Sequence, residues 1–252
     1  MKVRILSDLH INQNGNFELT DKEIFTIVAG DISKDFFQLK SWLQQNIKNG
    51  IFILGNHDFT GNTNMVDAYQ ELKEKFPASS NLTFLQNSYK EIDNKIFVGA
   101  TLWTDFSLEV NSPMKSKNAI KNLLHGYIRG NFSKEQNLTP EITIKEYKKS
   151  INYIDFICKE NPDKDIIIIT HHCPSMKCSA EKFKNNILNP ALITNLEDFI
   201  LEHKNIKAWC CGHCHRDPII TEVGNCKIIM NTKGYTKRDE CPNFDENFIV
   251  EI

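Results

Sequence analysis

Side chains that can bind a metal ion follow five short apolar runs of the sequence. Carboxylate, imidazole and amide groups together suit divalent ions such as manganese, iron, zinc and nickel. The runs have the length and composition of buried β-strands, and they lie at residues 3–6, 25–29, 51–54, 166–169 and 208–211. The polar residues that follow them, among them six of the eight histidines, are Asp8, His10, Asp31, Asn56, His57, Asp58, His171, His172, His213 and His215. We therefore predict a metal site where five strands end.

Each of these pieces, taken alone, has an ordinary explanation. The segment 55–58 can be a simple turn, and a His-x-His such as His213 and His215 is more often incidental than a ligand pair. Alternate residues of an extended segment do, however, point to the same side. Asp8 can therefore face one site together with His10, and the ordered recurrence at five strand ends favours metal binding over coincidence.

The first part of the sequence alternates apolar runs with amphipathic segments. Ser33 is the predicted N-cap of a helix over about residues 34–48, and a second helix is predicted at 65–76, before Pro77. Strand–helix–strand alternation predicts a parallel sheet with helices on its faces. The apolar face expected for the first helix consists of Phe36, Phe37, Leu39, Leu43 and Ile47.

The rest of the sequence predicts shorter strands and one long helical region. We expect a helical excursion at about residues 107–160, lying over the edge of the sheet, with Thr139 and Pro140 starting its last helix. No boundary is evident, so residues 1–252 are interpreted as a single domain. Short strands are predicted at 82–85, 89–92 and 95–102, and antiparallel strands that complete a second sheet at 218–223, 226–230 and 248–252.

Composition and charge weigh against several classes of partner. Hydrophobic residues make up 40% and charged residues 25% of the chain, as in ordinary globular proteins. A formal net charge of -2 weighs against nucleic acid as a partner without excluding it. No apolar stretch approaches the ~20 residues that span a bilayer, so no membrane partner is expected. Met1 leads directly into a strand without a signal peptide, which favours a cytoplasmic location. The oligomeric state is left open.

The eight cysteines are expected to be reduced thiols, because the length and the apparent lack of a signal peptide argue against a disulfide framework. Cys211 and Cys214 form a C-x-x-C next to Cys210, which raises a zinc or a redox hypothesis. A redox C-x-x-C normally opens a helix, whereas this one closes a strand. Redox chemistry is therefore disfavoured, and the role of the three cysteines is left open.

The strand-end motifs resemble, in order, the five motifs of the calcineurin-like metallophosphoesterases. Segments 101–106, 170–175 and 234–245 resemble those of small bacterial single-domain members. The resemblance implies an α/β (α+β) fold, a two-layered β-sandwich flanked by helices, with a dinuclear metal centre at the carboxyl ends of the strands. Cys214 stands where the family more often has a small aliphatic or hydroxyl residue. The matching motifs are Asp8-x-His10, Gly30-Asp31, Gly55-Asn56-His57-Asp58, Thr170-His171 and Gly212-His213-x-His215.

The resemblance also implies a ligand set for two divalent metal ions. Manganese is the favoured ion, with iron, zinc, nickel or magnesium as alternatives. Asp31 is expected to bridge the two ions. His171 is preferred to the adjacent His172, which stays an alternative ligand or a substrate contact. The first ion would take Asp8, His10, Asp31 and His215, and the second would take Asp31, Asn56, His171 and His213.

Such a centre implies hydrolysis of a phosphomonoester or a phosphodiester. Two cations ~3.5–4 Å apart clamp a phosphoryl group and acidify a bridging water toward the hydroxide that attacks phosphorus. His57 is expected to protonate the leaving group, and Asp58 is expected to hold the tautomer of His57 and raise its pKa. The candidates for binding the substrate are His172, Asn56 and Arg216.

A small phosphorylated compound is the expected partner, and two other functions stay open. The first is a non-catalytic scaffold that keeps the fold and binds metal, which would be expected to have lost one of the motif residues. The second is a zinc or redox protein in which Cys210, Cys211 and Cys214 carry the chemistry. Metal that stays bound while the thiols react freely would rule out ligation by thiolates.

Overall fold

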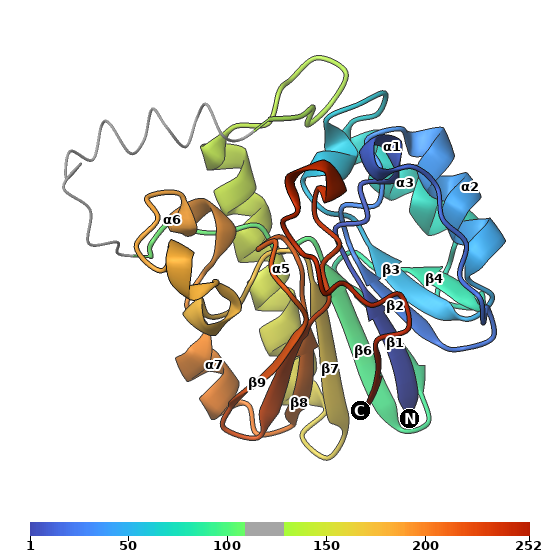
Figure 1. Cartoon of the computed structure of the whole chain (residues 1–252). Helices are drawn as coiled ribbons and strands as arrows, with labels where there is room; N and C mark the ends of the chain where they lie inside the picture. Colours follow the sequence, from blue (N-terminus) through green and yellow to red (C-terminus); the bar gives the residue numbers. More distant parts are fainter. Residues whose placement is uncertain (109–128) are drawn as a thin grey trace.

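Two β-sheets form the centre of the molecule in the computed structural model, which describes residues 1–108 and 129–252 (Figure 1). In the first sheet, β1 to β4 run parallel and β11 pairs antiparallel with β1. The terminal run at 248–252 was expected in the second sheet, but it adds to the first. The strand order of the first sheet is β11 (Ile249–Glu251), β1 (Lys2–Leu6), β2 (Thr26–Ala29), β3 (Gly50–Ile53) and β4 (Leu82–Phe84).

The second sheet has a parallel centre and an antiparallel strand at each edge. Strands β6, β7, β8 and β10 run parallel, whereas β5 and β9 pair antiparallel with β6 and β10. The turn between β5 and β6 is formed by Asp93 and Asn94, both of which have a positive φ. The strand order is β5 (Ser88–Ile92), β6 (Lys95–Ala100), β7 (Asp165–Thr170), β8 (Ile206–Cys210), β10 (Cys226–Met230) and β9 (Ile219–Val223).

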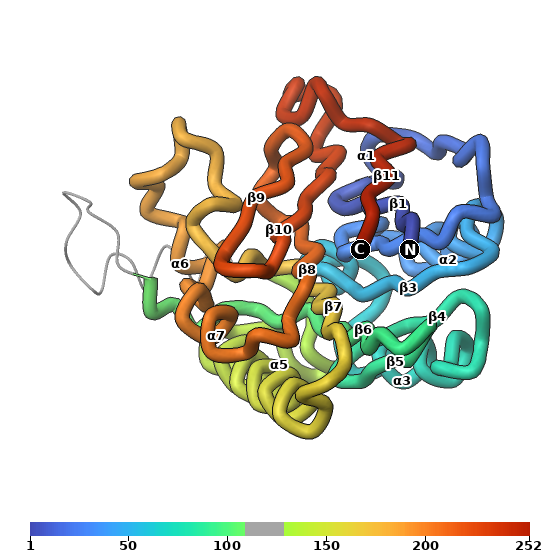
Figure 2. Tube along the Cα trace, turned by 90° about the horizontal axis from the view of Figure 1, so that it is seen from below, coloured from blue at the N-terminus to red at the C-terminus, as the bar shows by residue number. Residues whose placement is uncertain are grey.

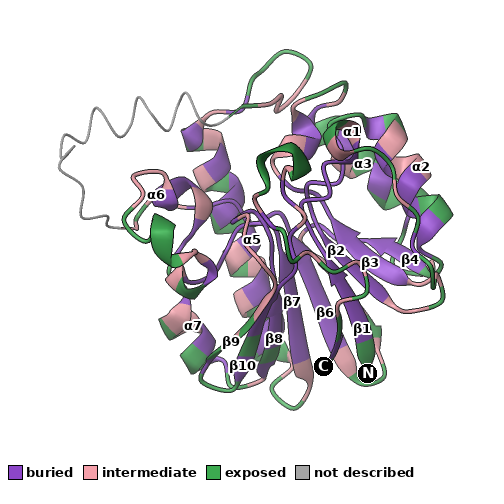
Figure 3. Cartoon of the chain, in the orientation of Figure 1, coloured by how far each residue is buried: buried purple, intermediate pink, exposed green. Residues whose placement is uncertain are grey.

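The inner faces of the two sheets share one apolar core. Alternate residues of a strand point to opposite faces, so Ile167 and Ile169 of β7 enter this inner core while Ile166 and Ile168 face the helices. The central strands are therefore buried on both sides, whereas the edge strands are partly exposed (Figure 3). The inner core also contains Val3, Ile5, Ile27, Ile51, Ile53, Phe97, Ala208 and Ile229.

Helices cover the outer face of each sheet (Figure 1 and Figure 2). Helices α2 (Phe36–Asn46) and α3 (Met65–Lys75) lie over the first sheet, and α5 (Pro140–Glu160) and α7 (Glu197–Glu202) lie over the second. The α/β architecture expected from the sequence, two sheets flanked by helices, is confirmed. No helix of the described residues is long and apolar enough to cross a membrane.

The start and the buried face of α2 differ from the prediction. Asp35, not Ser33, is the N-cap, and its carboxylate accepts hydrogen bonds from the backbone of Phe37 and Gln38. The Phe37 side chain is 77% exposed, and the core position goes to Trp42, whose Nε1 donates to a backbone carbonyl at 2.8 Å. Phe37 is one position along the helix from Phe36, which is buried, and so lies outside the stripe that contacts the sheet. Apolar character alone does not tell the two positions apart.

The helical excursion expected at about residues 107–160 is only partly within the described chain. Residues 109–128 lie outside the described residues. Thr139 caps α5 as predicted, accepting from the backbone N–H of Ile142, with Pro140 in the first turn. Between residue 129 and Thr139 the chain is not helical and contains an isolated bridge from Asn131 to Asn137.

Replacing Phe97 with alanine tests the inner core. Phe97 is fully buried between the sheets, so we expect Phe97→Ala to lower the free energy of unfolding by about 3–5 kcal/mol. Phe37→Ala removes the same side chain from an exposed site and should change it by less than about 0.5 kcal/mol. Urea unfolding followed by circular dichroism measures both. Equal losses for the two variants would contradict this packing.

Candidate metal centre

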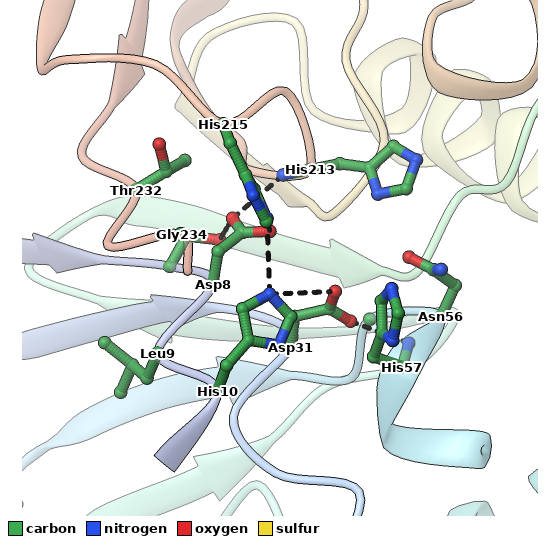
Figure 4. A network of polar contacts seen from close by, with 12 residues as sticks. Asp8, Leu9, His10, Asp31, Asn56, His57, His213, His215, Thr232 and Gly234 are labelled. Carbon is green, nitrogen blue, oxygen red and sulfur yellow. Dashed lines mark hydrogen bonds and ion pairs between the residues drawn. The ribbon is translucent and has the colours of Figure 1, made fainter. Parts of the chain in front are cut away.

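The carboxyl ends of β1, β2, β3, β7 and β8 meet at one edge of the sandwich, where the loops that follow them carry the predicted ligands. Figure 4 labels those from the loops after β1, β2, β3 and β8. Two contacts join the sheets at this edge. The Nδ2 of Asn231, just after β10, donates to the carbonyl of Ile5 at 2.8 Å, and Ser7 forms a parallel bridge with Thr232. Loops from both sheets are thereby brought over one site.

A first group of ligand atoms forms around Asp8, His10 and His215. The Nε2 atoms of His10 and His215 are 3.2 Å apart, and His215 Nε2 is 3.2 Å from Asp8 Oδ1. Asp31 Oδ2 lies 3.8 Å from His10 Nε2. All three residues of the group offer an atom within 4.8 Å of the others. Two imidazoles and two carboxylates thus converge, as the resemblance implied.

A second group forms around Asp31, His171 and His213. His171 Nε2 is 3.4 Å from Asp31 Oδ1 and 3.1 Å from His213 Nδ1. The amide oxygen of Asn56 lies 3.0 Å from the same Nε2 atom. Of the two histidines that follow β7, it is therefore His171 and not His172 that reaches Asp31.

Asp31 belongs to both groups and lies between them. Its Oδ1 faces the second group and also accepts the backbone N–H of His57 at 2.8 Å. Its Oδ2 faces His10, is buried, and has no hydrogen-bond partner among the described residues. A buried carboxylate oxygen without a partner is costly unless a cation or a donor satisfies it. The residues present therefore fit two metal ions that share Asp31.

Two contacts behind the ligands set which imidazole nitrogen faces the site. His171 Nδ1 donates to the carbonyl of Ala29 at 2.9 Å, and His215 Nδ1 donates to Glu240 Oε2 at 2.5 Å. Since carbonyl and carboxylate oxygens only accept, each ring in its neutral, metal-binding form presents the lone pair of Nε2 to the site. Glu240 was not predicted, because it lies in a polar loop without a motif and meets His215 only in the folded chain.

The second oxygen of Asp8 is held by the protein itself. Asp8 Oδ2 accepts from Ser7 Oγ at 2.6 Å and from the backbone N–H of His213 at 2.9 Å. Only Oδ1 then remains to face His215. These donors fix the carboxylate plane and join the loop after β1 to the loop after β8.

Four of the candidate ligands have a backbone conformation that is rare for residues other than glycine. The left-handed region costs roughly 1–3 kcal/mol for such a residue and is found mainly at functional sites. Hydrogen bonds hold it here: Asp8 N donates to the carbonyl of Gly30 and His10 N to that of Asp31, both at 3.0 Å. The four φ values are 53° for Asp8, 42° for His10, 55° for Asp31 and 66° for His213.

Two motif glycines are required by close approach. A Cβ atom on Gly55 would lie 2.1 Å from Asp31 Oδ1, and one on Gly212 would lie 2.5 Å from Asp8 Oδ2. Neither carboxylate could keep its position beside a side chain. The glycines of two motifs therefore let the backbone pass directly behind the ligands.

The buried carboxylates and imidazoles of the site shift one another's pKa values. Burial by itself raises the pKa of Asp31, but the imidazoles of His171 and His57 outweigh it and hold that pKa well below its ordinary value. Burial lowers the pKa of His171 and His215, yet the carboxylates around them raise these pKa values to about 9 and about 10. A cation entering the site would displace protons from both rings, since only a neutral imidazole is a ligand.

Asp58 does not orient His57 as expected. It is fully buried, and its two oxygens accept from the backbone N–H groups of residues 31–33 and Gly55 at 2.8–3.0 Å. No hydrogen bond joins it to the His57 ring in the described part of the chain. Asp58 instead fastens the loop that carries Asp31 to the loop after β3, because backbone N–H groups of both loops donate to its carboxylate.

His57 stands at the wall of the site. Its ring is half-buried, its centroid is 5.2 Å from that of His10, and its Nε2 lies 3.5 Å from the hydroxyl of Tyr235. The ring of Tyr235 in turn stacks on His10 with centroids 4.4 Å apart. This places an imidazole beside the candidate ligands without making it one of them.

His172 lies behind the site. It is buried, its Nδ1 donates to the carbonyl of Thr101 at 3.1 Å, and its ring packs against His213 with centroids 4.4 Å apart. Burial and the neighbouring His171 lower the pKa of His172 to about 3, so the ring is neutral. In this placement the ring of His172 packs behind His213 and supports it.

Arg216 also differs from its expected role. Its Nη1 donates to the carbonyls of Lys177 and Ser179 at 3.1 Å, so the guanidinium braces that loop from behind instead of facing a substrate. Other cations line the cavity over the site, whose volume is about 1070 Å³. They are Lys34, Arg129, Lys182 and Arg238.

Comparison with known proteins gives one family and two informative relatives. The model of the calcineurin-like phosphoesterases matches residues 1–217. "Uncharacterized protein L509" of Acanthamoeba polyphaga mimivirus is 28% identical over 287 residues, which cover 99% of this chain and 96% of that protein. This relative is viral and gives no support to the expected likeness to bacterial members.

A solved structure supports the fold independently. The crystal structure of phosphopantetheinyl hydrolase (PptH) from Mycobacterium tuberculosis aligns with a TM-score of 0.72 at 14% identity, covering 100% of this chain and 95% of that one. The family match includes all five strand ends that carry Asp and His ligands. From the match and from the two groups of ligands that meet at these strand ends, we conclude that this chain belongs to the calcineurin-like phosphoesterase family.

Proposed function

We propose that this chain is a hydrolase that uses two divalent metal ions to cleave a phosphomonoester or a phosphodiester. The observation that carries this proposal is the position of Asp31, whose two carboxylate oxygens face two separate groups of ligand atoms. A shared carboxylate holds two cations at the short separation that in-line displacement at phosphorus requires. A single-ion site would need no such residue.

The donor set also limits the metals. Two carboxylates, four imidazoles and one amide suit ions of intermediate softness, so manganese is favoured, with iron, zinc, nickel or magnesium as alternatives. Bound there, two such ions would supply positive charge to the phosphoryl oxygens and acidify a water molecule between them. The ligands are Asp8, His10, Asp31, Asn56, His171, His213 and His215.

His57 is placed to act as the general acid. Its backbone N–H bonds to Asp31, which fixes the residue relative to the metal ligands, while its ring faces the cavity next to Tyr235. A leaving-group oxygen on a phosphorus held over the site would lie within reach of this ring. Asn56 is shared between metal binding and the cavity wall, where its amide can contact the substrate.

A small phosphorylated compound is the substrate that the cavity favours. Its walls carry lysine and arginine side chains at several points, whereas the chain as a whole has a net charge of -2. Positive charge confined to a cavity suits a compact anion better than an extended polyanion such as nucleic acid.

All eight cysteines are free thiols, which is consistent with a reducing compartment such as the cytoplasm.

A non-catalytic scaffold of the same fold is the less favoured function. Such a protein has no need for a complete ligand set or for a positioned acid. This chain keeps all seven candidate ligands in two converging groups and keeps His57 at the cavity wall. The hydrolase from M. tuberculosis is similar to this chain in fold at 14% identity, and so low an identity says nothing about the substrate of this chain.

Asp31→Asn tests the shared carboxylate. The change removes the charge common to both groups, so we expect weaker binding of both ions, whereas wild-type protein reconstituted with manganese should hold two per chain. Asp163→Asn, on an exposed turn after α5, is the control and should bind two. Elemental analysis after gel filtration measures the content. At most one ion per chain in reconstituted wild type would count decisively against the proposal.

Glu240→Ala tests the residue behind His215. Without the carboxylate at Nδ1, the ring is free to turn or to change tautomer, and metal affinity should fall by about 10–100-fold. Glu160→Ala, at the exposed end of α5, is the matched control. Titration with manganese against a competing chelator gives the affinities. Unchanged affinity in Glu240→Ala would show that this contact does not orient the ligand.

His57→Ala tests the general acid and the proposed reaction together. The variant should keep both ions and lose roughly 10²–10⁴-fold in rate on alkyl phosphates, whose leaving groups need a proton. Nitrophenyl esters, whose leaving group departs without one, should lose far less. Rates across a leaving-group series, with metal content checked in each sample, provide the measurement. Equal losses across the series would sink the general-acid role, and no hydrolysis by wild type would sink the function.

A further inference from the structure

Three buried cysteines lie together next to the loops that carry the metal ligands, and a fourth follows one of them in the same loop. The Sγ atoms of Cys173, Cys178 and Cys211 all lie within 4.8 Å of one another, and Cys214, also buried, follows Cys211 in the same loop. Cys210, although adjacent in sequence, points into the core between the sheets. The cluster is thus formed by a different set of cysteines from the one that the sequence suggested.

The four residues come as two pairs from two neighbouring loops. Cys173 and Cys178 are separated by four residues in the loop after β7, and Cys211 and Cys214 by two residues in the loop after β8. Structural zinc sites are commonly built from two such pairs, each with two to four intervening residues. Each loop also carries one candidate ligand of the second group.

The separation of the sulfur atoms suits an ion. Cys178 Sγ and Cys211 Sγ are 3.8 Å apart. Four sulfurs placed tetrahedrally at the Zn–S bond length of about 2.3 Å lie about 3.8 Å from one another. A disulfide would require about 2.05 Å. The spacing is therefore that of two ligands of one zinc ion.

A positive charge lies next to the cluster. Four thiolates around Zn²⁺ carry a net charge of -2, which is costly to bury without compensation. Arg216 braces the backbone on both sides of Cys178 through the carbonyls of Lys177 and Ser179, and its charge acts on the Cys178 thiol. Its Nε is buried and has no hydrogen-bond partner in the described chain.

We infer that Cys173, Cys178, Cys211 and Cys214 bind one structural zinc ion. The ion would join the loops after β7 and β8, and so hold His171 and His213 at their spacing. Cys173 Sγ now donates to the carbonyl of Gly212 at 3.0 Å, and zinc binding would release this thiol proton together with the others. This site is additional to the two ions shared by Asp31 and does not depend on the proposed hydrolysis.

Packing and redox chemistry explain the cluster less well. Buried free cysteines are common as small apolar side chains, but packing does not require four of them to converge from two loops. Cysteines that act in redox sensing are solvent-accessible, whereas each member of this cluster is buried. Three converging sulfurs, with a fourth cysteine three positions further along one of the loops, match the ligand pairs of a structural zinc site.

The test measures zinc that resists a chelator. Protein produced with added zinc is treated with EDTA to remove ions from the Asp and His ligands, and the remaining metal is measured. We expect about one zinc per chain, released in step with titration of the thiols by a mercurial reagent. Protein refolded with one equivalent of cobalt should show the thiolate-to-cobalt charge-transfer bands of a tetrahedral site. No retained zinc together with no such bands would overturn the inference.

Variants separate this site from the dinuclear centre. Cys178→Ser should reduce the retained zinc from about one to near zero, whereas Cys158→Ser and Cys226→Ser, at buried cysteines elsewhere, should keep it. Asp31→Asn should also keep it. The cobalt spectrum of wild type needs no variant to fold. Zinc that disappears in Asp31→Asn but persists in Cys178→Ser, a disulfide within the cluster, or iron in place of zinc would each contradict the assignment.

Discussion

A buried carboxylate, that of Asp31, lies between two groups of imidazoles, and its charge is what the surrounding structure must balance. Burial favours its protonation, whereas the nearby imidazoles favour its ionised form and prevail. One oxygen has no hydrogen-bond partner among the described residues and faces His10, while the other faces His171. Two cations would satisfy both oxygens at once. The other candidate ligands are the residues whose side chains gather beside one or the other of these two oxygens.

The fold supports this carboxylate with backbone as much as with side chains. Asp58 holds the backbone N–H groups of residues 31–33, and Gly55 leaves room for the Asp31 oxygen that a Cβ would occupy. Left-handed conformations at Asp8, His10 and Asp31 turn the chain sharply after its strands. The strained turns persist because rigid, doubly buried strands precede them and hydrogen bonds between loops hold them. The inner core thus stabilises the geometry that the ligands require.

The sequence predicted most of the strands, the parallel direction of the first ones, and the residues that meet at their ends, because motif residues directly follow apolar runs. What it missed depends on tertiary contacts. Glu240 reaches His215 from a loop without a pattern, and Arg216 is occupied by backbone carbonyls that no local rule foresees. Phe37 was assigned to the core by its apolar character, whereas one step around α2 exposes it. Whether a side chain is buried, and which atoms it contacts, depends on how the whole chain packs.

Anomalous X-ray diffraction from crystals of protein reconstituted with manganese tests the central claim most directly. The account predicts two manganese peaks about 3.5–4 Å apart, with Asp31 Oδ2 bound to the ion beside His10 and Oδ1 bound to the ion beside His171. A single manganese peak between the two groups of ligands would contradict the account. So would two ions with Asp31 bound to only one of them.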